Sequence, residues 1–424
     1  MLIRFRVANF RSLRDDQELS MVSALRGGRT DLVPVEGLGI DLLRVAGIYG
    51  PNAAGKSNLL DALLFMAEAV VGSHRLWPPV GPIPREPFLL DAKSHEEPSL
   101  FEVDLVIGGV RYQYGFALDS EKIVEEWLHV FPRGRRQVWL SRDVEEAEPF
   151  AFGKHLKGNN RILARMTRPN CLFLSVAAGY NHEALLPVYR WFAQGFRFAA
   201  AEERVSWASL QQFLGRRERK ENEAALLDLL QRADLGVTGF EVRKEAPGRS
   251  SEEQPDLFLR SPDGGLWVFE LKHQTGRATV SLPAAKESRG TRAWLSLVGP
   301  ILEALESGSL LCVDELDASL HPRLAVEVIQ IFQNPDLNPK GAQLLFNTHD
   351  TSLLGTLLGE PVLHRDQVWF VEKDRDGASR LYPLTNFKPR KVENVERGYF
   401  HGRYGAIPYF SPRPLLLNGQ KQES

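Results

Sequence analysis

The hydrophobic positions of this chain follow strand and helix periods in separate segments. Residues 3–7 alternate between apolar side chains and arginines, which predicts a strand with one buried face. Residues 42–49 are almost continuously apolar, as in a strand that is buried on both faces. An amphipathic helix is expected from about Lys56 to Val71. The amino-terminal part of the chain therefore predicts a strand, a loop and a helix in that order.

The pattern changes several times along the rest of the chain. Prolines cluster between residues 72 and 98, which indicates an irregular connection. Short alternations predict strands after this connection, and apolar positions at helical spacing in residues 222–233 predict a helix. We therefore expect five segments: an amino-terminal lobe at 1–98, a β-rich piece at 99–149, a mainly helical insertion at 150–256, a carboxyl-terminal lobe at 257–410 and a flexible tail at 411–424.

The composition of the chain is that of a globular protein. The chain has 424 residues, of which 43% are hydrophobic and 25% are charged, and its net charge is −2, as in ordinary globular proteins. The longest apolar stretch, residues 62–71, is too short to span a bilayer, so we expect no membrane contact and a cytoplasmic location. Cys171 and Cys312 lie far apart in apolar runs and are expected to be buried thiols.

The loop after the first buried strand carries the strongest chemical signal. Residues 50–57 read GPNAAGKS, which matches the pattern G-x-x-x-x-G-K-[ST]. Glycines at this spacing let backbone N–H groups surround a β-phosphate, Lys56 reaches the β- and γ-phosphate oxygens, and Ser57 is placed to bind Mg²⁺. The sequence therefore predicts a nucleotide phosphate loop that binds ATP with Mg²⁺.

Two later strands end in polar residues that fit the same reaction. Residues 309–315, SLLCVDE, predict a buried strand whose end carries Asp314 as a magnesium ligand and Glu315 as the group that polarises the attacking water. Another apolar strand at residues 344–346 is followed by His349. Because ligands bind at the carboxyl ends of strands in open α/β sheets, we expect His349 to contact the γ-phosphate.

A predicted helix start between the phosphate loop and Asp314 also carries groups that could bind a phosphate. Ser288 and Gly290 open a helix that is expected to run to about Leu305. A serine hydroxyl and unpaired N–H groups at a helix start suit a γ-phosphate, although the same pattern is an ordinary helix cap. The position of this segment shortly before Asp314 favours the phosphate role.

The order of these motifs resembles the ABC-type ATPases of the SMC and RecF class. Residues 9–12, NFRS, resemble the amino-terminal strand motif of that class, residues 52–57 match Walker A, and residues 288–291 resemble the signature motif. Asp314 and Glu315 match Walker B, residues 317–322 resemble the D-loop, and His349 matches the switch histidine. More narrowly, ESRGT, DELDASLHP, NTHD and residues 397–408 resemble a bacterial AAA-type family of phage-defence and abortive-infection loci that includes RloA-like proteins.

The resemblance implies an α/β P-loop NTPase fold, namely an ABC-type ATPase head that is split in sequence. It implies homodimers or higher homo-oligomers with composite ATP sites, in which the signature of one subunit faces Walker A of the other. The stretch between Ser57 and Ser288 is too short for the long arms of SMC proteins, and the wide gap between Lys56 and Asp314 argues against a ring-forming AAA+ motor. The candidate for the Q-loop glutamine is Gln113.

The resemblance also implies the residues of the site. The metal ligands are Ser57 and Asp314, and the catalytic residues are Glu315 and His349. The nucleotide contacts are Asn52, Ala53, Ala54, Gly55, Lys56, Ser57, Asn58, Ser288, Gly290 and Arg11.

Two acidic patterns raise the alternative of a nuclease. Pro255-Asp256 followed by Glu270 and Lys272 fits the loose PD-(D/E)xK pattern, for which the simpler interpretation is a strand at residues 266–271. Glu372, Asp374 and Asp376 resemble a Toprim cluster, for which the simpler interpretation is a hairpin turn at Asp376-Gly377. We favour the strand and the turn.

Three functions remain open from the sequence. The preferred one is an ATPase switch of a bacterial anti-phage system that acts with a separate effector protein, such as a nuclease. The alternatives are a RecF-like DNA repair ATPase and an ATP-coupled nuclease. Basic clusters at residues 133–136, 216–220 and 397–404 leave nucleic-acid binding open, although such clusters are more often solvated surface.

Overall fold

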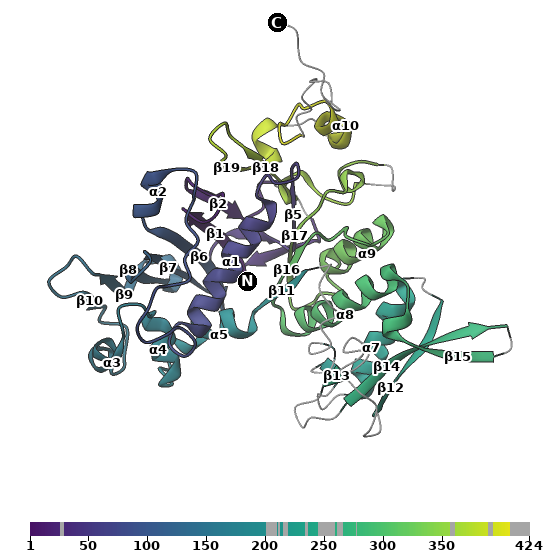
Figure 1. Ribbon diagram of the computed structural model, residues 1–424, viewed down its shortest axis with the longest axis horizontal. Coiled ribbons are helices and arrows are strands. Elements are labelled where there is room, and N and C mark those ends of the chain that lie inside the picture. Colours follow the sequence, from purple (N-terminus) through teal and green to yellow (C-terminus); the bar gives the residue numbers. More distant parts are fainter. Residues whose placement is uncertain are drawn as a thin grey trace, which may run out of the picture.

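The computed structural model is built around a parallel sheet that is flanked by two other sheets (Figure 1). A two-stranded hairpin, β3 (Leu32–Val35) and β4 (Ile40–Leu43), lies beside them. The structure describes residues 1–25, 29–200, 210, 213–214, 219–233, 236–244, 259–260, 266–276, 278–356, 361–388 and 393–407.

The parallel sheet gathers strands from four distant parts of the chain. Its order is β11 (Phe196–Ala200), β16 (Leu310–Asp314), β17 (Gln343–Asn347), β5 (Val45–Tyr49), β18 (Val368–Lys373) and β19 (Ser379–Pro383). All neighbours are parallel except β18 and β19, which form an antiparallel hairpin. The carboxyl ends of β5, β16 and β17 therefore meet at one edge, where an open α/β sheet binds its ligand.

Each face of this sheet belongs to a different hydrophobic core. Ala46 and Ile48 of β5 pack in the core that includes α1 (Lys56–Gly72), whereas Val45 and Tyr49 pack in the core that includes α8 (Arg289–Ser307) and α9 (Pro322–Gln333). Because successive side chains of a strand point to opposite faces, a strand between two cores must be apolar throughout. This is why residues 45–49 form a continuous apolar run.

The second sheet is antiparallel and lies on the α1 side. Its order is β10 (Phe150–Phe152), β9 (Gln137–Asp143), β8 (Ile123–Phe131), β7 (Val110–Leu118), β6 (Ser99–Ile107), β1 (Leu2–Ala8) and β2 (Gln17–Ser20). Phe5 and Val7 pack in the core that includes α1 and Arg4 and Arg6 lie on the other face, as the alternation predicts. The register shifts between Leu2 and Arg4, and here Leu2 packs in this core, whereas Ile3 packs with Val35 and Leu42 in a smaller cluster. The sheet thus joins the first strand to the β-rich piece.

A third sheet lies next to the start of α8 and away from α1 (Figure 1). It contains β12 (Val237–Lys244), β13 (Leu259–Arg260), β14 (Leu266–Thr275) and β15 (Ala278–Pro283). The helix α7 (Arg219–Arg232) packs against β12 and α8. Within the described ranges, the remaining α-helices are α2 (Ala92–Glu96), α3 (Asn160–Met166), α4 (Phe173–Gly179), α5 (Leu186–Gln194) and α10 (Val395–Phe400).

The segment 150–256 contains strands that the helical pattern did not predict. The described part of it does hold helices, but β11 pairs in parallel with all five residues of β16, and β12 joins the third sheet. The parallel sheet therefore includes β11, a strand that lies within the expected helical insertion. Tertiary pairing with β16 overrides the local pattern of this short segment, as is common for strands.

Other features of the described residues bear on the sequence-based expectations. Cys171 and Cys312 are both buried free thiols. None of the helices in the described ranges combines the length and the apolar character that crossing a membrane requires. The aromatic side chains of the segment 397–407 belong mainly to a core, because the rings of Tyr399 and Tyr404 stack on Phe370 with centroid distances of 5.4 and 5.8 Å. The tail 411–424 lies outside the described residues.

Candidate functional site

The loop between β5 and α1 has a backbone that only glycine permits at two positions. Gly55 has a φ of 105°, and a Cβ there would lie 2.2 Å from Ser379 Oγ. A Cβ on Gly50 would lie 2.2 Å from Val371 O. Gly50 and Gly55 therefore let the loop curl closely over the sheet and lead directly into α1, whose first turn carries no acidic residue. The amino end of α1 is left positive and suited to an anion.

Lys56 lies inside this loop. Its Nζ donates to Gly50 O at 2.9 Å and to Pro51 O at 3.1 Å, and it lies 3.4 Å from His349 Nδ1. Burial lowers the pKa of Lys56 to about 8, although Glu315 and nearby aspartates oppose this shift. Burial also lowers the pKa of His349, and the Lys56 ammonium lowers it further. The ammonium is thus held in place but poorly solvated, a state that a bound anion would relieve.

Asn347 connects three of the predicted site residues, and sequence analysis did not single it out. It is fully buried at the end of β17. Its Nδ2 donates to Ser57 Oγ at 3.4 Å and to Asp314 Oδ1, and its Oδ1 accepts from Glu315 N at 2.6 Å. The Asn347 amide thereby fixes α1 relative to Asp314, the last residue of β16, and Glu315, which follows it.

A second pair of contacts ties the loop after β16 to the loop after β17. Asp317 Oδ1 accepts from Thr348 Oγ1 at 2.6 Å and from His349 N at 3.1 Å. Glu315 lies two residues before Asp317 in the same loop and has a left-handed φ of 53°. A non-glycine residue in this region is strained, and such strain is often found where a side chain is held for function.

The back of the phosphate loop is held by two serines that lie far apart in the sequence. The Ser379 hydroxyl donates to Ala54 O and lies 2.7 Å from Ser12 Oγ, which accepts from Asn58 Nδ2 at 2.6 Å. These contacts join β19, the NFRS segment and α1. Nothing in the local pattern around Ser12 or Ser379 predicts them.

The resulting cavity has a volume of about 700 Å³. Asn52, Ala53, Ala54, Gly55, Lys56, Ser57, Asn58, Glu315, His349 and Lys373 line it. The seven predicted loop residues and both predicted catalytic residues therefore share one cavity. Lys373 also lines this cavity and was not predicted.

The oxygen atoms beside this cavity fit a nucleotide-bound magnesium ion. Ser57 Oγ and Asp314 Oδ1 both lie against the amide of Asn347. Mg²⁺ usually takes one or two protein oxygens and completes its shell with phosphate and water. The two predicted metal ligands therefore fit such an ion when the nucleotide supplies the rest.

Three predicted nucleotide contacts do not line the cavity. Arg11 forms ion pairs with Asp61 and with Glu86, at 2.8 Å in the second case. Ser288 caps α8 by accepting from Thr291 N at 3.1 Å, and a Cβ on Gly290 would lie 3.4 Å from Ser319 O of the D-loop-like segment. These roles remain predictions.

The Q-loop candidate and the proposed Toprim residues have other partners. Gln113 Oε1 lies 3.1 Å from His129 Nδ1 on the antiparallel sheet, and it does not line the cavity. Asp374 Oδ1 accepts from Asp376 N and Ala378 N inside the β18–β19 turn. The turn expected at Asp376-Gly377 is therefore confirmed.

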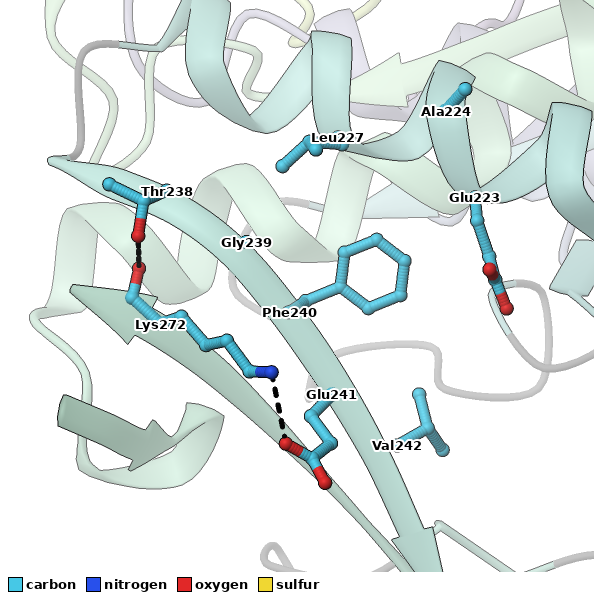
Figure 2. Close-up of a pocket in the computed structure, with 9 residues that line it drawn as sticks. All are labelled: Glu223, Ala224, Leu227, Thr238, Gly239, Phe240, Glu241, Val242 and Lys272. Atoms are coloured by element: carbon cyan, nitrogen blue, oxygen red, sulfur yellow. Dashed lines mark hydrogen bonds and ion pairs between the residues drawn. The ribbon is translucent and has the colours of Figure 1, made fainter. Parts of the chain in front are cut away.

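Of the proposed nuclease residues of β14, Lys272 lines a second, smaller cavity between α7 and β12 (Figure 2), and Glu270 does not line it. Lys272 forms an ion pair with Glu241 at 3.1 Å, which Figure 2 shows, and Glu270 forms one with Arg243 at 3.1 Å. Each charge thus pairs across neighbouring strands, as in an ordinary sheet. Asp256 lies outside the described residues. The strand interpretation of residues 266–271 is confirmed.

The family comparison points to the same part of the chain. A family described as "AAA domain, putative AbiEii toxin, Type IV TA system" matches residues 45–355. The matched range begins with β5 and ends just after His349, so it contains the phosphate loop, the signature segment and the residues after β16 and β17. No curated protein matches the chain.

Solved structures of SMC heads also match over most of the chain. The SMC head domain from Thermotoga maritima is 14% identical, with 90% of this chain and 98% of that chain covered and a TM-score of 0.40. The Smc head domain bound to the carboxyl-terminal domain of ScpA from Pyrococcus furiosus is 14% identical, with 91% and 97% covered and a TM-score of 0.37. Likeness at this level carries no conclusion about function.

Proposed function

The chain belongs to this family of AAA domains, and we propose that it is an ATP-hydrolysing switch that works as a dimer. The observation that carries the proposal is the split between two groups of motif residues. Lys56, Glu315 and His349 line one cavity of a single chain, whereas Ser288 and Gly290 do not. A second subunit that docks its signature segment over the cavity would complete the site.

The geometry supports a specific division of labour during hydrolysis. Lys56 and the N–H groups of the loop bind the β- and γ-phosphates, and His349 lies beside Lys56 to contact the γ-phosphate. Glu315 polarises the attacking water, and its backbone is fixed by Asn347. A magnesium ion bound by Ser57 and Asp314 would neutralise charge that develops on the phosphates.

We propose further that ATP state controls a separate effector in a bacterial defence system. The family description names an abortive-infection toxin and a toxin–antitoxin system, which supports a defence role. The candidate nuclease residues Glu270 and Lys272 are engaged in ion pairs with other residues of the same sheet, which favours an effector site in another protein. A change of assembly driven by ATP is a suitable signal to such a partner.

Mixing two inactive variants tests the composite site. Lys56→Ala removes the phosphate contact and Ser288→Arg blocks the signature, so each homodimer should be inactive. In the mixed dimer one site keeps both halves intact, and ATP turnover should recover to at most about half of wild type.

A second mixture is the matched control. Lys56→Ala and Glu315→Gln alter the same half of the site, so in their mixed dimer both sites carry a lesion and no recovery is expected. The dimer model fails if the first mixture stays inactive although mixed dimers form, as shown by co-purification through two different tags. It also fails if both mixtures recover equally.

A further inference from the structure

Lys373 is the residue of the nucleotide cavity that no motif explains. It is the last residue of β18, and its side chain is exposed within the cavity. Among the described residues that line the cavity, Lys56 and Lys373 carry the positive charges. A nucleotide diphosphate or triphosphate brings several negative charges into this space, so a second cation would contribute to binding it.

The strand period explains why the lysine, and not its acidic neighbours, faces the cavity. Trp369 and Val371 of β18 pack in the core that includes α1, and Lys373 continues the same alternation. The phosphate loop turns into α1 on this face of the sheet. Glu372 points to the other face, where its Oε2 accepts from Ala406 N at 3.0 Å.

The remaining acids of the hairpin are also turned away from Lys373. Asp374 and Asp376 form ion pairs with Arg14 at 3.2 and 3.3 Å. Within the described ranges, the Lys373 side chain forms no hydrogen bond or salt bridge of its own. The hairpin therefore presents a cation that its own carboxylates do not neutralise.

The register of the sheet places Lys373 on a definite side of the phosphate loop. Phe370 of β18 pairs with Tyr49, the last residue of β5. Three residues further on, Lys373 ends β18 and Asn52 lies in the phosphate loop that follows β5. His349 follows β17, which is the neighbour of β5 on the opposite side. Lys373 and His349 thus flank the loop from its two sides.

We propose that Lys373 is a nucleotide-binding residue that contacts the α- and β-phosphates. This inference rests on the proposed function, because that proposal assigns the γ-phosphate to the side of His349 and Glu315. The side of β18 then receives the part of the nucleotide that ATP and ADP share. The hairpin is fixed for this contact, since Ser379 of β19 is bonded to Ala54 of the loop.

Calorimetry with two nucleotides tests the assignment on the full chain. ADP and the β,γ-imido analogue of ATP are titrated into wild type, Lys373→Ala and Arg375→Ala. Arg375 is the matched control, because it is an exposed cation of the same turn that does not line the cavity. Lys373→Ala should weaken both nucleotides by about fivefold to tenfold, as expected for loss of one partly solvated phosphate contact. Arg375→Ala should leave both affinities unchanged.

Two further results separate the possible failures. The inference is overturned if Lys373→Ala binds both nucleotides normally, or if it weakens only the ATP analogue, which would place Lys373 at the γ-phosphate. Lys56→Ala in the same experiment tests the phosphate loop itself. Normal binding by Lys56→Ala would overturn the proposed function, whereas loss of binding by Lys56→Ala beside normal binding by Lys373→Ala would overturn the Lys373 assignment alone.

Discussion

The phosphate loop and the signature segment are held in opposite ways. The loop and α1 are tied by side chains to β17, to the NFRS segment and to β19, through Asn347, Ser12 and Ser379 respectively. Ser288 bonds only to Thr291 of its own helix among the contacts of its hydroxyl in the described residues, at 3.1 Å to the N–H and 2.8 Å between hydroxyls. One region is organised in advance for a ligand, and the other is a complete helix cap, so the phosphate role that we propose for it requires a second subunit.

Among the variants that test this difference between the two regions, Glu315→Gln should have the largest effect on ATP turnover. Glu315→Gln should keep nucleotide binding but lower turnover by about a thousandfold, because the amide cannot polarise the water as a carboxylate does. The bound ATP should then hold two subunits together, which light scattering of the ATP complex would detect. A variant with normal turnover, or one that stays monomeric with ATP bound, would break the comparison.

A smaller effect is expected at Asn347. Asn347→Ala should lower turnover by roughly tenfold to a hundredfold, because Ser57, Asp314 and Glu315 lose their common partner. It should also lower the free energy of unfolding by about 1–3 kcal/mol, the usual cost of buried groups left without partners.

Asn338 provides the control for this variant. It is equally buried, and its amide bonds to Phe332 O, Ala342 O and Ala342 N, away from the cavity. Asn338→Ala should lower the free energy of unfolding similarly while the folded fraction keeps wild-type turnover. Equal loss of turnover in both variants would mean that Asn347 acts only through stability.

The smallest effect concerns the protonation of Lys56. Burial lowers the pKa of Lys56 to about 8, and a bound phosphate should raise the pKa again. Nucleotide binding should therefore take up protons near pH 8, and ADP affinity should fall by roughly tenfold from pH 7 to pH 9. Calorimetry in two buffers that differ in ionisation enthalpy measures the uptake, and equal heats in both would contradict it.

The same shift predicts how the free protein responds to pH. The unfolded chain keeps Lys56 protonated up to its ordinary pKa near 10.5, so it binds more protons than the folded chain between about pH 8 and pH 10.5. The contribution of Lys56 to the free energy of unfolding therefore rises with pH across that window. Thermal unfolding of wild type and Lys56→Met across this range would isolate the contribution.

The parts of the fold that sequence predicted are those specified by short, local patterns. The strand before Gly50, the helix from Lys56 and the strand before Asp314 each combine an apolar run with a distinctive ending. The glycine positions of the loop could also be predicted, because backbone contact with phosphate requires them. Local chemistry and tertiary structure agree at these positions.

The parts that were missed depend on contacts between distant residues. β11 is a five-residue strand whose identity comes from pairing with β16, more than a hundred residues later. The role of Asn347 follows from three partners on other elements, and Ser12 and Ser379 meet only in the fold. Lys373 lies between Glu372 and Asp374, and this acidic pattern predicts a turn or a metal cluster rather than a phosphate contact. A single sequence contains no local sign of such pairings.

The strand order of the parallel sheet has a consequence for how the protein is made. β5 ends at Tyr49, whereas its two neighbours, β17 and β18, begin at Gln343 and Val368 and therefore leave the ribosome much later. At about 5–20 residues per second, the apolar strand that precedes the phosphate loop waits roughly 15–60 s for a partner. A nascent chain released before residue 343 contains the whole phosphate loop but cannot form the sheet that shapes it, so ATP binding must wait until β17 and β18 have been made.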